Sequence, residues 1–211
     1  MATKRRTRAL VAVAAILAVA VAGLLTPPSG PRTLKAFDPE QTAALEVDMW
    51  QAYYAKENVR MFADLVRLTR QQFHYSWWTS LRSGFHLAKA AATFGNARDR
   101  YERVLPDLET AFTISRDWTG ATYDPAALAK SELAWWVARR VPAESSPENV
   151  GRLIAVVDGA LYDKPADQVL EAAVLRARAG RLRDEGGTNA DWPEVSRLLH
   201  ESYRKLHAAV Q

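Results

Sequence analysis

The sequence predicts an all-α fold: an antiparallel bundle of seven or eight helices that follows an N-terminal signal or anchor helix. From residue 38 onward, apolar residues recur at the three- and four-residue spacing of amphipathic helices. Pairs that favour a helix start recur as well, as in Asp38-Pro39 and Asp124-Pro125. No stretch shows the period-two alternation of apolar and polar residues that would indicate a strand instead. These observations together predict a fold without β-sheet.

The first segment, residues 1–25, has the organisation of a secretory signal. An apolar run, Ala9 to Leu25, follows the four cations Lys4, Arg5, Arg6 and Arg8 and precedes a proline-rich exit. Because such cations favour the cytoplasmic side, the remainder is expected on the outer side of the inner membrane. The sequence leaves open whether residues 9–25 stay as a membrane anchor or are cleaved, which would release a secreted protein.

The boundaries of the linker and of the expected helices follow from residues that favour the beginning or the end of a helix. Residues 26–37 are expected to form a linker, and residues 38–211 an all-helical domain. Pro106 is expected to kink one helix or to begin a separate one, and glycines at the ends of the third and seventh helices favour termination there. The expected helices cover about residues 38–58, 59–74, 76–95, 97–118, 124–141, 146–162, 165–186 and 191–211.

The domain contains one internal echo. Asp38-Pro39, Ala43, Glu46 and Trp50 are matched 86 residues later by Asp124-Pro125, Ala129, Glu132 and Trp136. A duplication would divide the domain into halves 38–122 and 123–211. Shared capping chemistry would also explain the echo, so both explanations remain open.

Charge and cysteine usage exclude several classes of function. The chain has 28 Lys and Arg, 24 Asp and Glu, and a net charge of +4, all of which lies in the first segment. The domain itself is neutral, so no nucleic-acid partner is expected. The absence of cysteine excludes disulfides, thiolate metal sites and a cysteine nucleophile. Motifs for phosphate loops, nucleophile elbows and zinc proteases are missing too, and no cofactor is predicted.

Two glutamates carry the strongest site signal. Glu46 and Glu132 fall on helix stripes among large aromatic residues, and a buried carboxylate needs a partner. The expected partners are Trp or Tyr donors, Arg139 or a cation from a neighbouring helix. We therefore expect a buried polar cluster of Glu46, Trp50, Tyr53, His86, Glu102, Glu132, Trp136 and Arg139.

A metal or acid–base site is the alternative for the same region. Glu46, His86, Glu102 and Glu132 come from four predicted helices, as do the ligands of carboxylate-bridged metal centres in helical bundles. The usual Glu-x-x-His pair is missing, so a structural role is the leading interpretation and no metal is expected.

Arginines and tryptophans gather elsewhere. The run Arg176, Arg178, Arg181 and Arg183 is interpreted as a solvated helix face. In each double tryptophan, Trp77-Trp78 and Trp135-Trp136, one ring is expected at a groove, a partner surface or the membrane interface.

Four segments resemble an uncharacterised bacterial family of helical proteins with no established activity. They are Glu46-x-x-Met49-Trp50-x-x-Tyr53-Tyr54, Phe85-His86-Leu87-Ala88, Tyr101-Glu102-x-x-Leu105-Pro106-x-Leu108 and Glu132-x-x-Trp135-Trp136. The resemblance covers about residues 38–140. It implies that some relatives carry a histidine near the position of Arg139, so the arginine here argues against a metal site and favours an ion pair between Glu132 and Arg139.

The sequence thus predicts a non-enzymatic, membrane-anchored or exported helical protein that acts as a binding or scaffold module in the cell envelope. Its expected partner is another envelope protein or a peptide. A metal-dependent or acid–base enzyme with a carboxylate–histidine site in the bundle is the alternative.

Overall fold

The prediction of an all-α fold is confirmed. A computed structural model describes the backbone of residues 2–211 and the side chains of residues 13–211, and this part of the chain contains helices and no strand. The α-helices are α1 (Ala2–Leu25), α2 (Pro39–Tyr54), α3 (Asn58–Phe73), α4 (Trp77–Asn96), α5 (Leu105–Thr119), α6 (Pro125–Ala138), α7 (Pro147–Tyr162), α8 (Ala166–Gly186) and α9 (Trp192–Val210). Two short 3₁₀ turns, η1 (Tyr101–Val104) and η2 (Gly187–Asn189), precede α5 and α9.

The helices begin where capping residues stand. The Asp38 carboxylate accepts hydrogen bonds from the backbone N–H groups of Glu40 and Gln41, and Asp124 caps α6 in the same way. These bonds satisfy donors that a helix start leaves without a partner. The start expected at residue 97 was wrong, because residues 97–100 are not helical; the alternative in which Pro106 begins a separate helix is confirmed, since Pro106 stands in the first turn of α5.

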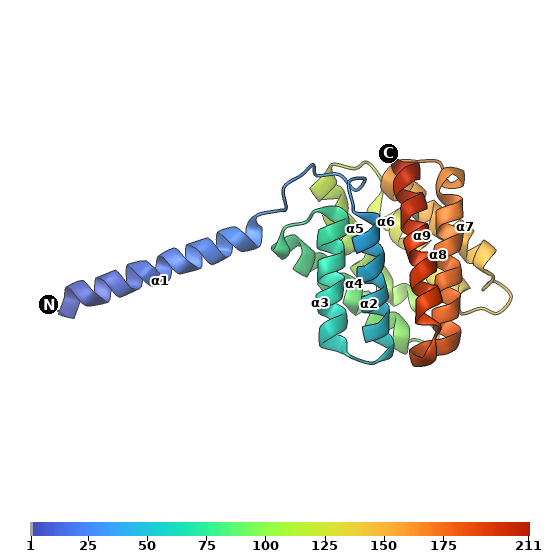
Figure 1. Cartoon of the computed structure of the whole chain (residues 1–211), viewed down its shortest axis with the longest axis horizontal. Helices are drawn as coiled ribbons and strands as arrows, with labels where there is room; N and C mark the ends of the chain where they lie inside the picture. The colour runs from blue at the N-terminus through green and yellow to red at the C-terminus, as the bar shows by residue number, and fades with distance from the viewer. Residues whose placement is uncertain (1) are drawn as a thin grey trace.

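The eight helices α2 to α9 form a closed ring. Each packs against the next one along the chain, and α9 returns to pack against α2 (Figure 1). The closest packing joins α7 and α8, where a Cβ at Gly151 would meet the Val174 backbone at 2.8 Å. Closing the ring brings residues from both ends of the sequence to one interior.

Part of the predicted linker belongs to the core. Leu34 and Phe37 are almost fully buried, and the Phe37 ring contacts Tyr162, Tyr203 and His207. These contacts attach the segment before α2 to α7 and α9. The ring is therefore held at its closure by a stretch of chain that precedes it.

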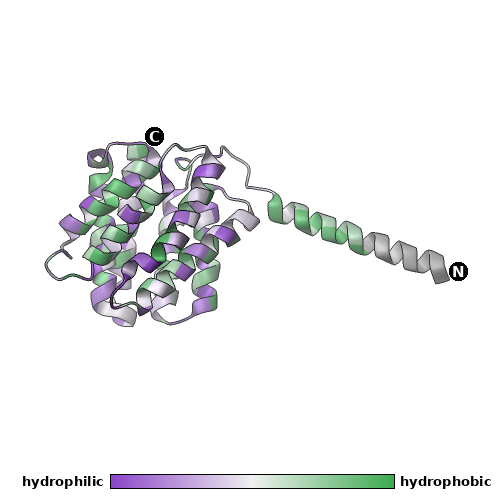
Figure 2. Ribbon diagram, turned by 180° about the vertical axis from the view of Figure 1, so that it is seen from behind, coloured by the Kyte–Doolittle hydropathy of each residue, from purple (hydrophilic) through white to green (hydrophobic). Residues whose placement is uncertain are grey.

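The α1 helix extends away from the ring, and apolar residues predominate along the part nearest to it (Figures 1 and 2). The side chains of Lys4, Arg5, Arg6 and Arg8, on which the export prediction depends, lie outside the described residues. Among the helices that the structure describes, none combines the length and the apolar character needed to cross a membrane.

Candidate functional site

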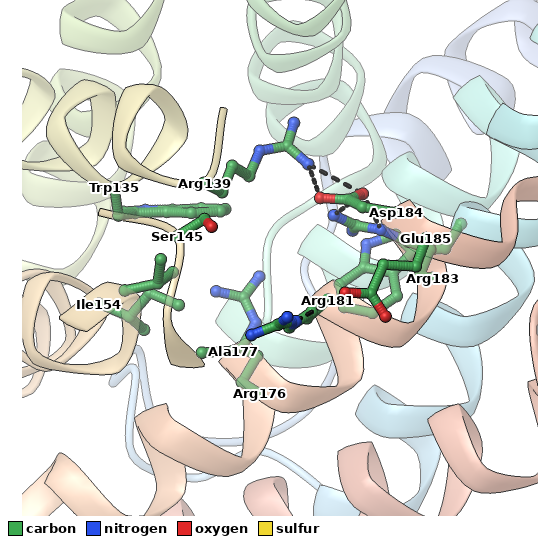
Figure 3. Close-up of a pocket in the computed structure, with 13 residues that line it drawn as sticks. Trp135, Arg139, Ser145, Ile154, Arg176, Ala177, Arg181, Arg183, Asp184 and Glu185 are labelled. Atoms are coloured by element: carbon green, nitrogen blue, oxygen red, sulfur yellow. Dashed lines mark hydrogen bonds and ion pairs between the residues drawn. The ribbon is translucent and has the colours of Figure 1, made fainter. Parts of the chain in front are cut away.

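A cavity of about 280 Å³ lies inside the ring, and each helix from α2 to α9 contributes side chains to its wall. We call it the central cavity. A second hollow of about 220 Å³, the side pocket, opens between α2, α6, α7 and α8 (Figure 3). The two adjoin, because they share the lining residues Trp50, Trp135, Arg139, Ile154, Arg176 and Arg183.

The lining of the central cavity repeats along the chain. On α2 and α6 the lining residues correspond 86 residues apart, and on α3 and α7 they correspond 89 residues apart. The matched pairs are Glu46 with Glu132, Met49 with Trp135, Trp50 with Trp136, Tyr53 with Arg139, Leu65 with Ile154, Leu68 with Val157, Thr69 with Asp158 and Gln72 with Leu161.

The later helices continue this register. On α4 and α8, Leu87 corresponds to Arg176 and Phe94 to Arg183, again 89 residues apart. On α5 and α9 the offset is 91, and it relates Ala111 to Ser202, Phe112 to Tyr203 and Ser115 to Leu206. The two halves of the ring therefore present equivalent positions to the cavity but fill them with different chemistry.

Charge is confined to one side of the central cavity. The lining residues from α3, α4 and α5 include no charged side chain, and most are aliphatic or aromatic. The charged lining residues come from α2 and from the second half of the chain: Glu46, Glu132, Arg139, Asp158, Arg176 and Arg183. The cavity thus has an apolar wall and a charged wall.

Glu46 is fully compensated on the charged wall. Its carboxylate is 1% exposed and accepts hydrogen bonds from Arg176 Nη2 at 2.6 Å and from the Tyr203 hydroxyl at 2.7 Å. Burial lowers the pKa of Arg176, but the adjacent Glu46 carboxylate raises it to well above its usual value. Of the partners that the sequence left open for Glu46, the structure shows a cation from another helix and a Tyr donor.

A second charged group stands in the side pocket. Asp184 lies between two guanidinium groups and accepts bonds from Arg139 at 2.9 Å and from Arg183 at 2.8 Å. Figure 3 shows this group on one side of the pocket, opposite Trp135 and Ile154, with the Arg176 guanidinium between the two sides. The two cations lower the pKa of Asp184 against the effect of its burial.

Two half-buried carboxylates on the charged wall have no such compensation. Among the described residues, neither Glu132 nor Asp158 has a cation within ion-pair distance; Glu132 accepts one hydrogen bond, from Trp136 Nε1 at 2.9 Å. Burial raises the pKa of Asp158 to about 7, because it outweighs the favourable charge of Arg176 and because Glu132 adds repulsion. Burial also raises the pKa of Glu132, an effect that Trp135, Arg176 and Trp136 offset in part.

Other buried polar groups on the cavity wall make no hydrogen bond within the described part of the chain. They are the hydroxyls of Tyr75 and Ser115, the indole N–H of Trp135 and the Nε–H of Arg139. The Trp135 N–H lies near Glu132 without meeting the geometry of a hydrogen bond. Buried polar groups are nearly always paired, so this concentration at one cavity is a feature that calls for a functional explanation.

The structure brings together six of the eight predicted site residues. Glu46, Trp50, Tyr53, Glu132, Trp136 and Arg139 all line the central cavity, whereas His86 and Glu102 do not. His86 Nδ1 instead contacts Asp107 Oδ1 at 2.9 Å, and Glu102 is exposed on η1. The alternative metal set is therefore not assembled, and no group of three His, Asp or Glu in the described residues is placed to hold a metal.

Two further expectations need correction. Arg139 does not pair with Glu132, because Asp184 on α8 offers it a carboxylate at 2.9 Å. The arginine run is not one solvated face: Arg178 and Arg181 are each 52% exposed, whereas Arg176 and Arg183 turn inward. Seven residues are two helical turns, so the inward arginines share one stripe of α8 with buried Val169, Ala172 and Ala173.

The sequence did not predict four residues of the cavity wall: Asp158, Arg176, Arg183 and Tyr203. Their positions on the apolar stripes of α7, α8 and α9 were the available signal, since a charged residue there must find a partner or line a cavity. The tryptophan pairs also divide differently than expected: Trp77 and Trp78 are both exposed, while Trp135 and Trp136 both line the central cavity.

Comparison with known proteins adds no assignment to this geometry. No family model, curated protein or solved structure matches the chain, and the resemblance to a bacterial family of helical proteins stays a prediction.

Proposed function

We propose that this chain is a binding protein of the cell envelope that holds a small organic molecule in the central cavity. The observation that carries the proposal is the pair Glu132 and Asp158, which face the cavity without a cationic partner among the described residues. A carboxylate held away from bulk water is costly to ionise unless a cation pairs with it. Strongly perturbed ionisable groups in a cavity are typical of functional sites.

The shape of the site favours a small ligand over the envelope protein or peptide expected from the sequence. Ligand cavities are concave and largely apolar, with a few polar groups that fix orientation. The central cavity, with one apolar and one charged wall, fits this description. At about 280 Å³ it stands near the lower end of the size range of such sites.

A duplication forms the second part of the proposal. The constant offsets between lining residues support an origin of the ring from two related halves, residues 38–122 and 123–211. In this account the lining of the first half, apart from Glu46, stayed uncharged, and the second half acquired Asp158, Arg176 and Arg183 at the positions of Thr69, Leu87 and Phe94.

The location in the envelope rests on the first segment, with its cluster of cations before an apolar run. Because the chain has no cysteine, single cysteines can report its topology. We expect Arg98→Cys, in the loop before η1, to react with a membrane-impermeant maleimide in intact spheroplasts. Thr3→Cys should react only after lysis if the segment is an anchor, and should be lost if it is cleaved. Labelling of Arg98→Cys only after lysis would contradict export.

The binding function can be tested with the full chain and an organic extract of the cells that produce it. We expect mass spectrometry to find a small molecule enriched on the washed protein. Ala88→Phe, which places a ring in the cavity, should abolish the enrichment. Ala92→Phe, on the outer side of the same helix, is the matched control and should retain it. Equal recovery from both variants, or no enriched molecule, would contradict the proposal.

Acid–base catalysis on the bound molecule is the second candidate. The observation that favours it is the Asp158 carboxyl, whose pKa of about 7 suits a group that exchanges a proton near neutral pH. An enzyme would release an altered form of the extracted molecule, and Asp158→Asn would stop that conversion. A binding protein would release the molecule unchanged.

A further inference from the structure

On the basis of the proposed function, we infer that the ligand of the central cavity is an organic cation with an apolar body. Its ammonium group would lie against Glu132 and Asp158, and its body would lie along the lining residues of α3, α4 and α5. Each part of this assignment follows from a different feature of the cavity wall.

The charge of the ligand follows from which carboxylates of the charged wall already have a cationic partner and which do not. Glu46 is compensated by Arg176, and Asp184 is compensated by Arg139 and Arg183. An anion would therefore have to compete with carboxylates that these arginines already bind. A cation, in contrast, would supply the partner that Glu132 and Asp158 lack among the described residues, and burial strengthens such a pair.

Aromatic rings surround the same carboxylates. Trp135 and Trp136 stand on α6 one helical turn after Glu132, and both line the cavity. The face of an indole attracts a cation. The Arg176 guanidinium carbon already lies 5.7 Å from the centre of the Trp135 ring, so this part of the wall accommodates positive charge.

The body of the ligand follows from the opposite wall. Leu65, Leu87 and Phe112 offer an apolar surface without a charged neighbour among the α3 to α5 lining residues. On this side the Tyr75 side chain is fully buried, and its hydroxyl makes no hydrogen bond among the described residues. The hydroxyls of Tyr75 and Ser115 lie close to each other, so the apolar wall carries one small polar spot.

The test uses three probes with one body and different head groups: 4-phenylbutylamine, 4-phenylbutanol and 4-phenylbutyrate. Binding to the full chain is measured by isothermal titration at pH 8. We expect the amine to bind at least about tenfold more tightly than the alcohol, and the carboxylate to bind most weakly. Lowering the pH to 5.5 should weaken binding of the amine roughly tenfold, because a protonated Asp158 no longer attracts it.

Single substitutions distinguish an effect on binding of the ammonium group from an effect on the stability of the fold. Asp158→Asn and Glu132→Gln should each reduce the affinity for the amine about tenfold or more and leave the affinity for the alcohol unchanged. Glu148→Gln, at the exposed start of the helix that carries Asp158, is the matched control and should leave amine binding unchanged.

The outcomes distinguish the ligand class from the proposed function. If the alcohol or the carboxylate binds as tightly as the amine, the cavity binds organic molecules but the inference of a cation is wrong. Equal loss of all probes in Asp158→Asn would also overturn it, because the residue would then act through the fold. If none of the probes binds and no molecule is recovered from the extract, the proposed function fails together with the inference.

Discussion

Replacing Arg176 with methionine is expected to lower the free energy of unfolding by about 3–5 kcal/mol at pH 8. The substitution removes the cation that compensates buried Glu46 and leaves Glu46, Glu132 and Asp158 facing one another across the charged wall. The loss should be smaller at pH 5, because protonation of Asp158 relieves part of the repulsion. Urea unfolding followed by tryptophan fluorescence measures both values.

Two controls show whether the pair, and not the helix, is responsible. Arg178→Met changes an exposed pair with Glu148 on the same helix and should cost less than about 1 kcal/mol. Adding Glu46→Leu to Arg176→Met removes both partners and should restore most of the lost stability, since an apolar replacement of a buried pair is often neutral. Equal losses for Arg176→Met and Arg178→Met would contradict the account of the charged wall.

Asp158→Asn is expected to stabilise the protein at pH 8 by about 2–4 kcal/mol, with almost no effect near pH 4. Burial raises the pKa of Asp158 to about 7 from an ordinary value of 3.8. Between these values the folded chain retains a proton that the unfolded chain releases, so the stability of the native protein falls as the pH rises from about 4 to about 7. Asparagine does not titrate, and the variant should lack this fall.

The measurement is a series of urea unfolding curves from pH 4 to pH 8. Asp167→Asn, an exposed change in the first turn of the next helix, should keep the native pH profile. If native protein and Asp158→Asn show parallel profiles over this range, Asp158 does not bear an unpaired charge in the folded state. A gain of stability on removing this charge would show that the carboxylate destabilises the fold, as residues of functional sites commonly do.

The fold class and most helix starts could be predicted because they depend on local chemistry. Asp38, Ser76, Asp124 and Ser146 each bond a backbone N–H of the helix that follows them. Such bonds span two or three residues and are visible in the sequence. The closure of the ring could not be predicted from the sequence, because the contact between α9 and α2 joins the two ends of the domain.

The site could be predicted in part. Glu46 and Glu132 were found because aromatic neighbours on their own helices indicated burial. Their partners were not, because Arg176 and Tyr203 lie more than 120 residues away from Glu46 along the chain. The run of four arginines also hid the difference between its members, which depends on the face that α8 turns to the cavity.

The prediction that His86 and Glu102 belong to the buried cluster was wrong for a related reason. Each stands on a helical segment that could have faced the interior, but the register of the segment decides the direction. His86 contacts Asp107, which also accepts a bond from Lys89, and this group lies apart from the glutamates of the cavity. Sequence spacing identifies residues on one helix that share a face, and does not identify which faces of different helices meet.

The central claim is that Glu132 and Asp158 hold the positive group of a ligand inside the ring. A crystal structure of the full chain with 4-phenylbutylamine at pH 8 tests it most directly. The account predicts the amine nitrogen within about 3 Å of the Glu132 and Asp158 carboxylates, with the phenyl ring against the apolar wall of α3, α4 and α5. An amine bound at the surface of the protein, or a phenyl ring on the charged wall, would contradict it.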